Sequence, residues 1–178
     1  INMRKQREAK FEMFKFDPDS PIPDSLRKVF PGPDYYPISK RWRKNARFTK
    51  NTKFQRIRMP KTDGQFDEYI IAGTVEFDFE GKSYRLTAYN PNVNDSKTLF
   101  IPFRDESSGK ETYGGGRYID TRLLDGYVIL DFNEAYNPYC VYDYFNWACP
   151  VPPEENRLPF NVEAGEKTFS WEEITGEI

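Results

Sequence analysis

The chain has 178 residues, a net charge of −2 and no histidine, which excludes Ser-His-Asp and Cys-His catalysis, histidine-ligated zinc and a histidine general base. Aromatic residues make up 17% of the chain, and with 14 prolines and 11 glycines they favour a mostly β protein with many turns. This length fits one soluble domain, which we place at residues 1–178.

Residues 1–37 are expected to wrap the outside of this domain as short helices and extended chain. Residues 3–16 are charged and helix-permissive, and the aromatic residues near the end of this run would dock it. Prolines on both sides limit a second helix to residues 24–30. Glu8 and Glu12 interrupt the basic residues of the first run, so we expect no nucleic-acid partner.

Residues 43–169 form the β body and carry short runs in which apolar and polar residues alternate. The clearest pair, 67–79 and 84–89, is joined by a tight turn at Glu80-Gly81. Short strands at close intervals predict an antiparallel barrel or a strongly bent sheet, with the short N-terminal helices packed outside. The other expected strands are residues 45–49, 54–59, 98–103, 111–113, 117–119 and 127–132.

A series of short motifs runs through the chain: residues 20–23 (SPIP), 30–32 (FPG), 35–37 (YYP), 99–105 (LFIPFRD), 108–114 (SGKETYG), 116–118 (GRY), 130–133 (LDFN), 135–138 (AYNP), 149–150 (CP), 152–153 (PP), 156–158 (NRL) and 164–167 (AGEK), with Cys140. In this order they resemble a bacterial and archaeal family known as domain of unknown function 1684. Pro33 departs from the pattern, since the family tends to have Leu after Phe-x-Gly. The resemblance implies no activity, because none is established for the family, and some members resemble exported or lipoprotein-like chains.

Arg104, Asp105 and Arg117 lie close to three consecutive glycines, residues 114–116. Glycine N–H groups can approach an anion closely, and an arginine fork can hold a carboxylate or phosphate with two parallel hydrogen bonds. The same residues can instead form an internal Arg–Asp network beside a tight turn. The absence of a phosphate-loop or dinucleotide motif favours the turn.

Asp131, Asn133 and Asn137 form a second candidate group. Alternation along residues 127–132 places Asp131 on the face opposite its apolar neighbours, from which it could enter a barrel mouth. Paired with Glu111 or Glu166, this carboxylate could act in acid–base catalysis. The two asparagines could instead be turn residues that bond their own backbone.

Cys140 and Cys149 are the only cysteines of the sequence. We expect a disulfide first, a pair of reduced structural thiols second, and a redox or nucleophilic role third. Two cysteines without histidine do not make an ordinary zinc site, so we expect no metal and no cofactor. The disulfide favours the periplasm or cell surface over the cytoplasm, although no signal peptide is visible in a chain that begins at Ile1. No apolar run approaches the ~20 residues of a membrane span.

Three functions are open, and a binding module is the first. Its barrel mouth, formed by residues 104–118 and 131–157, would take a small polar or anionic ligand. A histidine-free hydrolase or isomerase is the second, and a structural or partner-binding domain with an aromatic contact loop at 139–147 is the third. The candidate catalytic residues are Asp131, Glu111 and Cys140, and the candidate ligand-binding residues are Arg104, Asp105, Tyr113, Arg117, Tyr118, Asn133, Tyr136, Asn137, Asn156 and Arg157.

Overall fold

The computed structural model describes residues 2–176, so the ends of the predicted domain, residues 1 and 177–178, lie outside the described part. Within it, seven strands form one sheet in the order β6-β5-β4-β3-β1-β7, and β2 pairs with β3 off this path. The strands are β1 (Arg43–Lys50), β2 (Arg56–Pro60), β3 (Phe66–Phe79), β4 (Lys82–Asn90), β5 (Thr98–Phe103), β6 (Arg117–Arg122) and β7 (Tyr127–Asp131). The helices are α1 (Met3–Phe16) and α2 (Trp171–Thr175), with short 3-10 helices η1 (Asp24–Leu26), η2 (Lys40–Trp42), η3 (Phe132–Glu134), η4 (Tyr139–Val141) and η5 (Glu154–Asn156).

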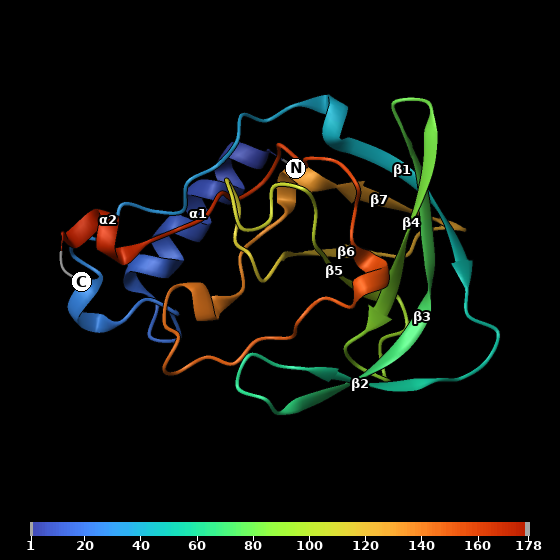
Figure 1. The fold of residues 1–178 in the computed structure, drawn as a ribbon, viewed down its shortest axis with the longest axis horizontal. Coiled ribbons are helices and arrows are strands. Elements are labelled where there is room, and N and C mark those ends of the chain that lie inside the picture. Colours follow the sequence, from blue (N-terminus) through green and yellow to red (C-terminus); the bar gives the residue numbers. More distant parts are fainter. Residues whose placement is uncertain (1, 177–178) are drawn as a thin grey trace.

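The sheet bends until its two end strands, β6 and β7, approach each other. Leu123, just beyond β6, forms an isolated bridge with Val128 of β7. Thr121 Oγ1 donates a hydrogen bond of 2.9 Å to the carbonyl oxygen of Ile129. The result is a nearly closed antiparallel barrel with one seam, and α1 lies outside it (Figure 1), which confirms the predicted fold class.

Two local predictions have different outcomes. The β3–β4 hairpin is present, and Glu80 and Gly81 have φ values of 49° and 78°, the left-handed pair that a two-residue turn of this kind requires. The strand predicted at residues 111–113 is wrong. Thr112 N donates to the carbonyl oxygen of Ser107 at 3.2 Å, which closes a compact turn in place of a strand.

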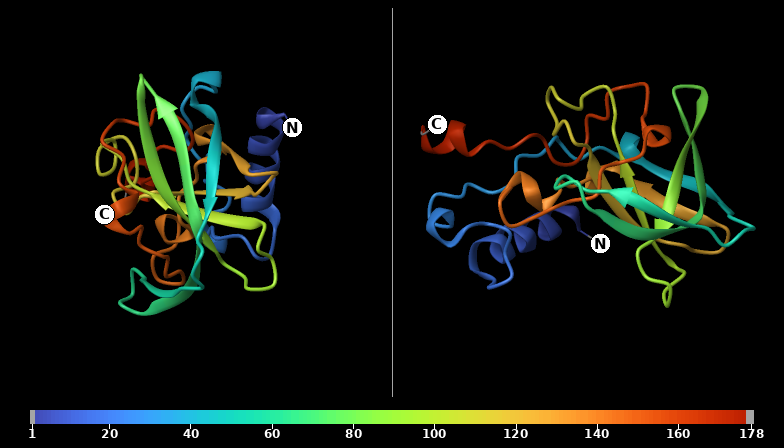
Figure 2. Two further views of the ribbon diagram at one scale, coloured as in Figure 1. Left: turned by 90° about the vertical axis from the view of Figure 1, so that its right-hand side faces the viewer. Right: turned by 60° about the horizontal axis from the view of Figure 1, so that its bottom comes forward.

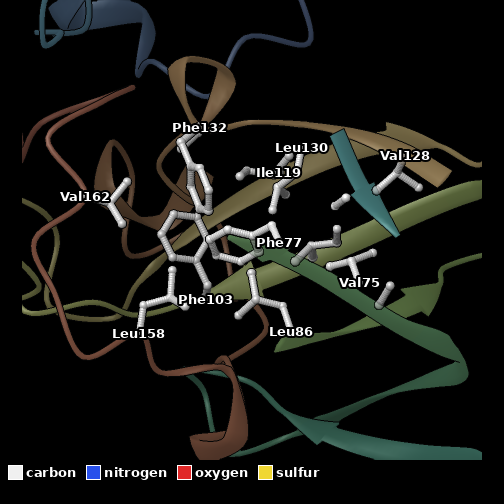
Figure 3. Packing of buried hydrophobic residues seen from close by; sticks show 14 of the residues in the cluster. Val75, Phe77, Leu86, Phe103, Ile119, Val128, Leu130, Phe132, Leu158 and Val162 are labelled. Atoms are coloured by element: carbon white, nitrogen blue, oxygen red, sulfur yellow. The ribbon is translucent and has the colours of Figure 1, made fainter. Parts of the chain in front are cut away.

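The interior of the barrel is filled by side chains (Figure 3). The rings of Phe77 and Phe103 each pack against Phe132 with centroids 5.5 Å apart. Leu158 and Val162, from the segment that follows the last strand, close the same cluster. This packing fills the barrel interior around these residues, and the largest of the clefts near the predicted mouth segments is described below.

A second layer of chain lies beside the barrel and contains α1, the extended segment after it and α2 (Figures 1 and 2). Asn2 caps α1 by accepting a hydrogen bond from Arg4 N, and the helix buries Phe14. The Phe14 ring meets those of Phe30 and Tyr142 at centroid distances of 6.0 and 5.2 Å. The helix predicted at 24–30 is only the single turn η1. None of the helices within residues 2–176 is long and apolar enough to cross a membrane.

Candidate functional site

A cleft of about 570 Å³ lies on the outer side of the barrel, between the sheet, α1 and the segment after β7. Alternation along β6 creates its floor, because Tyr118 and Asp120 point outward while Ile119 points into the core. We call it the aromatic cleft and define it by Tyr69, Phe100, Tyr118, Asp120, Tyr136 and Trp147.

Four of these rings form a continuous wall. Tyr69 stacks on Phe100 at a centroid distance of 5.3 Å, Phe100 meets the edge of Tyr118 at 4.9 Å, and Tyr118 meets Tyr136 at 5.7 Å. The Tyr118 hydroxyl donates a hydrogen bond to the carbonyl oxygen of Pro150, which also lines the cleft. Aromatic edge and stacking contacts hold such rings in fixed positions, so the wall is ordered in advance of any ligand.

Asp120 places a carboxylate on this floor. Its Oδ2 accepts a hydrogen bond of 2.7 Å from the Tyr136 hydroxyl, and the side chain is open to solvent. The concave walls nevertheless remove much of its hydration and raise its pKa, while the Tyr136 bond and the charge of Lys10 act in the opposite direction. Among the described residues, no cation lies within ion-pair distance of Asp120.

Lys10 of α1 also lines the cleft, but its charge is already compensated. Its Nζ forms an ion pair with the buried Glu166 and lies 5.1 Å from the ring centroids of Phe14 and Tyr136. Glu166 is further held by Asn137 N at 2.7 Å. The lysine therefore belongs to an internal network, which leaves Asp120 as the unpaired charge of the cleft.

A smaller pocket of about 260 Å³ adjoins the cleft and shares Lys10, Asp120 and Tyr136 with it. We call it the polar pocket, since Arg7 and Glu134 also line it. The Arg7 guanidinium donates to the carbonyl oxygen of Tyr36 at 3.1 Å and lies over the Tyr35 ring at 4.1 Å. Burial raises the pKa of Glu134. The two pockets together carry two cations against three carboxylates, the third being Glu166.

Arg117 lies on the other face of β6, where its guanidinium is completely buried. Nη2 forms a 2.8 Å ion pair with the equally buried Asp105, and the two Nη atoms donate to three backbone carbonyl oxygens of residues 162–166. Gly116, the residue before Arg117, has a φ of 91°, and a Cβ added there would lie only 2.6 Å from Phe103 O, so this position requires glycine. The structure therefore has the internal Arg–Asp network and the tight turn, and Arg117 lines neither pocket.

The remaining predicted polar residues do not converge. Asn156 is buried and joins β4 to β5 through Thr87 N at 2.7 Å and Pro102 O at 2.8 Å. Arg157 is exposed, 3.9 Å from the Glu106 carboxylate, and neither it nor Arg104 lines the two pockets. These residues fasten segments of the chain to the barrel.

The predicted catalytic carboxylates also lie apart. Asp131 is buried, pairs with Arg43 at 3.1 Å and caps η3 by accepting from Asn133 N. Glu111 is exposed and lines neither pocket. Asn137 bonds Lys167 O at 2.8 Å, so it crosslinks two segments. No shared acid–base site results from this arrangement.

Cys140 and Cys149 are free thiols, so the expected disulfide is not formed in this structure. They are neighbours in space, because Cys140 N donates to Cys149 Sγ at 3.3 Å. A hydrogen bond from the Cys149 thiol, and weaker ones from Tyr113 and Thr62, lower the pKa of Cys140 to about 7 against the effect of burial. Cys149 lines the aromatic cleft, and its own pKa is raised by the same pairing and by burial.

Some of the residues predicted from the sequence line these two pockets. Tyr118 and Tyr136 line the aromatic cleft and Asn133 lines the polar pocket, while Tyr113 lines neither and its hydroxyl lies 4.0 Å from Cys140 Sγ. Asp120 was missed, although its place two residues after Tyr118 in an alternating strand gave a usable signal. Cleft residues outside the predicted set include Lys10, Tyr69 and Phe100, while Trp147 belongs to the aromatic contact loop predicted at 139–147.

Comparisons with known proteins find a matching family model and a similar solved structure. A family model described as "Protein of unknown function (DUF1684)" matches residues 28–167. The solution NMR structure of an uncharacterized protein from Haloarcula marismortui is 37% identical and has a TM-score of 0.73, and the match covers 93% of this chain and 92% of that one. No curated protein matches the chain.

Proposed function

The chain belongs to the DUF1684 family, and we propose that it binds a small polar organic molecule in the aromatic cleft. The observation that supports this proposal is the combination of a fixed ring wall with one carboxylate that has no ion pair within the described part of the chain. Small-molecule sites are typically clefts of roughly 300–1,000 Å³, lined by apolar and aromatic groups with a few polar groups that orient the ligand. A volume of about 570 Å³ falls in this range.

The placement of the arginines favours a polar ligand over an anionic one. Arg117 is enclosed with Asp105, and Arg104 and Arg157 line neither pocket. Lys10 lines the cleft but is paired with Glu166. An anion entering the cleft would meet Asp120 without a free cation beside it, which costs electrostatic energy.

The test is a library of small polar fragments screened by backbone amide NMR of the isotope-labelled chain. We expect the hits to shift the amide signals of Tyr69, Tyr118 and Trp147. Trp147→Ala should weaken the affinity of these hits at least about fivefold, because it removes one ring of the cleft. Phe145→Ala is the matched control, because Phe145 lies on the same loop, is 95% exposed and does not line the cleft. Hits that map elsewhere, or equal losses in both variants, would contradict the proposal.

A second candidate function is thiol–disulfide exchange at Cys140 and Cys149, favoured by their contact and by the pKa of about 7 of Cys140. The Cys140 thiolate would attack one sulfur of a small disulfide and expel one thiolate. Cys149, after losing its proton to water, would attack Cys140 Sγ and expel the second thiolate. One intramolecular disulfide forms while the small disulfide is reduced to two thiols.

Mass spectrometry after incubation with glutathione disulfide tests this second candidate. The intact chain should lose two hydrogens, and Cys149→Ser should retain a mixed disulfide on Cys140. Iodoacetamide should alkylate Cys140 with a midpoint near pH 7, below the ~8.5 of an ordinary thiol. No mass change, together with an ordinary alkylation midpoint, would reduce the pair to structural thiols.

A further inference from the structure

The charges around the aromatic cleft favour a cation as its occupant. Asp120 is the unpaired charge on the floor, and the cleft and polar pocket together hold three carboxylates against Arg7 and Lys10. Both cations are already used internally, Lys10 by Glu166 and Arg7 by backbone carbonyls and the Tyr35 ring. A positive group placed beside Asp120 would equalise the numbers of positive and negative charges in the two pockets.

Two hydroxyl donors on the floor of the cleft are also used internally. The Tyr118 hydroxyl donates to Pro150 O, and the Tyr136 hydroxyl donates to Asp120. What these two side chains leave for a ligand is ring surface, beside the remaining acceptor capacity of the Asp120 carboxylate. Ring faces and acceptors attract cations, because an aromatic ring carries negative charge on its face.

The cleft already accommodates one ammonium group. Lys10 Nζ lies 5.1 Å from the Tyr136 centroid, within the distance at which a ring face attracts a cation. The volume of about 570 Å³ leaves room for an organic group much larger than a hydrated metal ion or a second primary ammonium. An alkylated ammonium is held by aromatic rings of the protein and by a nearby negative charge, rather than by hydrogen bonds from each N–H.

We propose that the aromatic cleft binds an alkylated ammonium ion, with its charged head beside Asp120 and its alkyl groups against the rings of Tyr69, Tyr118 and Trp147. This inference rests on the proposed function, since it names the chemical class of ligand for the same cleft. A set of rings with one carboxylate is how proteins generally recognise quaternary ammonium groups.

The test compares two probes of the same shape by NMR titration and calorimetry: choline, and its uncharged analogue 3,3-dimethylbutan-1-ol. Choline should shift the amides around Tyr118 and Asp120 and bind at least about tenfold more tightly, since removal of the charge removes the attraction to ring faces and carboxylate. Asp120→Asn should abolish most of that difference, and Phe145→Ala should not change it. A thermal melt of each variant confirms that it is folded.

Choline binding should also depend on pH. Ionised Asp120 attracts the cation, so affinity should fall as pH drops through the raised pKa of this carboxyl, and binding there should release protons. The groups that face Asp120 are Lys10 from α1 and the tyrosines Tyr136, Tyr69 and Tyr139, and burial raises the pKa of each of these tyrosines, away from the acidic range. The carboxylates of Glu134 and Glu166 in the polar pocket are farther contributors, and Glu134→Gln controls for the first.

The outcomes separate the two proposals. If the uncharged analogue binds in the cleft as tightly as choline and Asp120→Asn changes nothing, the ammonium inference is wrong and the binding function stands. If neither probe and no fragment shifts the cleft amides, both proposals fail. If choline binds elsewhere on the surface, the inference is overturned by the map of shifts.

Discussion

The two faces of β6 treat charge in opposite ways. Arg117 and Ile119 point inward, where Arg117 is saturated by Asp105 and three carbonyl oxygens. Tyr118 and Asp120 point outward, where the carboxylate has one hydrogen bond from Tyr136 and no ion pair with any residue in 2–176. The inward charge is part of the scaffold and the outward charge is available. The completeness of a charged group's contacts, more than its residue type, thus distinguishes the supporting network from the candidate site.

The largest effect should come from the inward charge. Arg117→Met leaves Asp105 buried without its partner, and breaking a buried pair in this way costs about 4 kcal/mol. Urea unfolding measures this loss. Arg122→Met is the control on the same strand, because its pair with Asp95 is exposed, has an N–O distance of 3.4 Å and should contribute less than about 1 kcal/mol. If both variants lose the same free energy of unfolding, the buried and exposed charges of β6 do not differ in the way described.

Ile119→Ala tests the apolar part of the same inward face. The side chain is fully buried against the barrel core, so its truncation should cost about 3 kcal/mol through lost burial and the cavity left behind. Fragment binding in the aromatic cleft should keep its affinity in the folded variant, since Ile119 points away from the cleft. An affinity change as large as that of Trp147→Ala would show that the two faces are not independent.

The sequence predicted the barrel well but named only some of the residues that line the aromatic cleft. The β3–β4 hairpin was readable because alternation and the Glu80-Gly81 turn are local signals. Whether Arg117 would be saturated was not readable, because its acceptors lie at residues 162–166 and reach it only through the fold. The cleft combines α1, β3, β5 and β6 with the segment after β7, and no local pattern brings these elements together. Contacts between distant segments decide which polar residues remain available.

Tyr136→Phe sharpens the comparison on the outward face. It removes one hydroxyl and its hydrogen bond to Asp120, which should cost about 1 kcal/mol. Because that bond lowers the pKa of Asp120 against the effect of its surroundings, the variant should have a still higher Asp120 pKa, measured by NMR titration of the carboxyl. Tyr127→Phe on β7 is the exposed control and should leave this pKa unchanged.

Asp120→Asn should have the smallest effect on stability, below about 0.5 kcal/mol, as is usual for an exposed side chain away from a buried network. Its sign depends on pH. The folded pKa of Asp120 is raised, so ionisation opposes folding, and the native chain should lose stability as pH rises from about 4 through the raised value. The variant lacks this loss, so it should gain on the native chain across that window and keep the gain at neutral pH. Urea midpoints measured from pH 3 to 8 test the sign. A variant that instead becomes relatively less stable as pH rises would mean that folding favours the ionised Asp120, and the outward charge would then be a scaffold charge like Arg117.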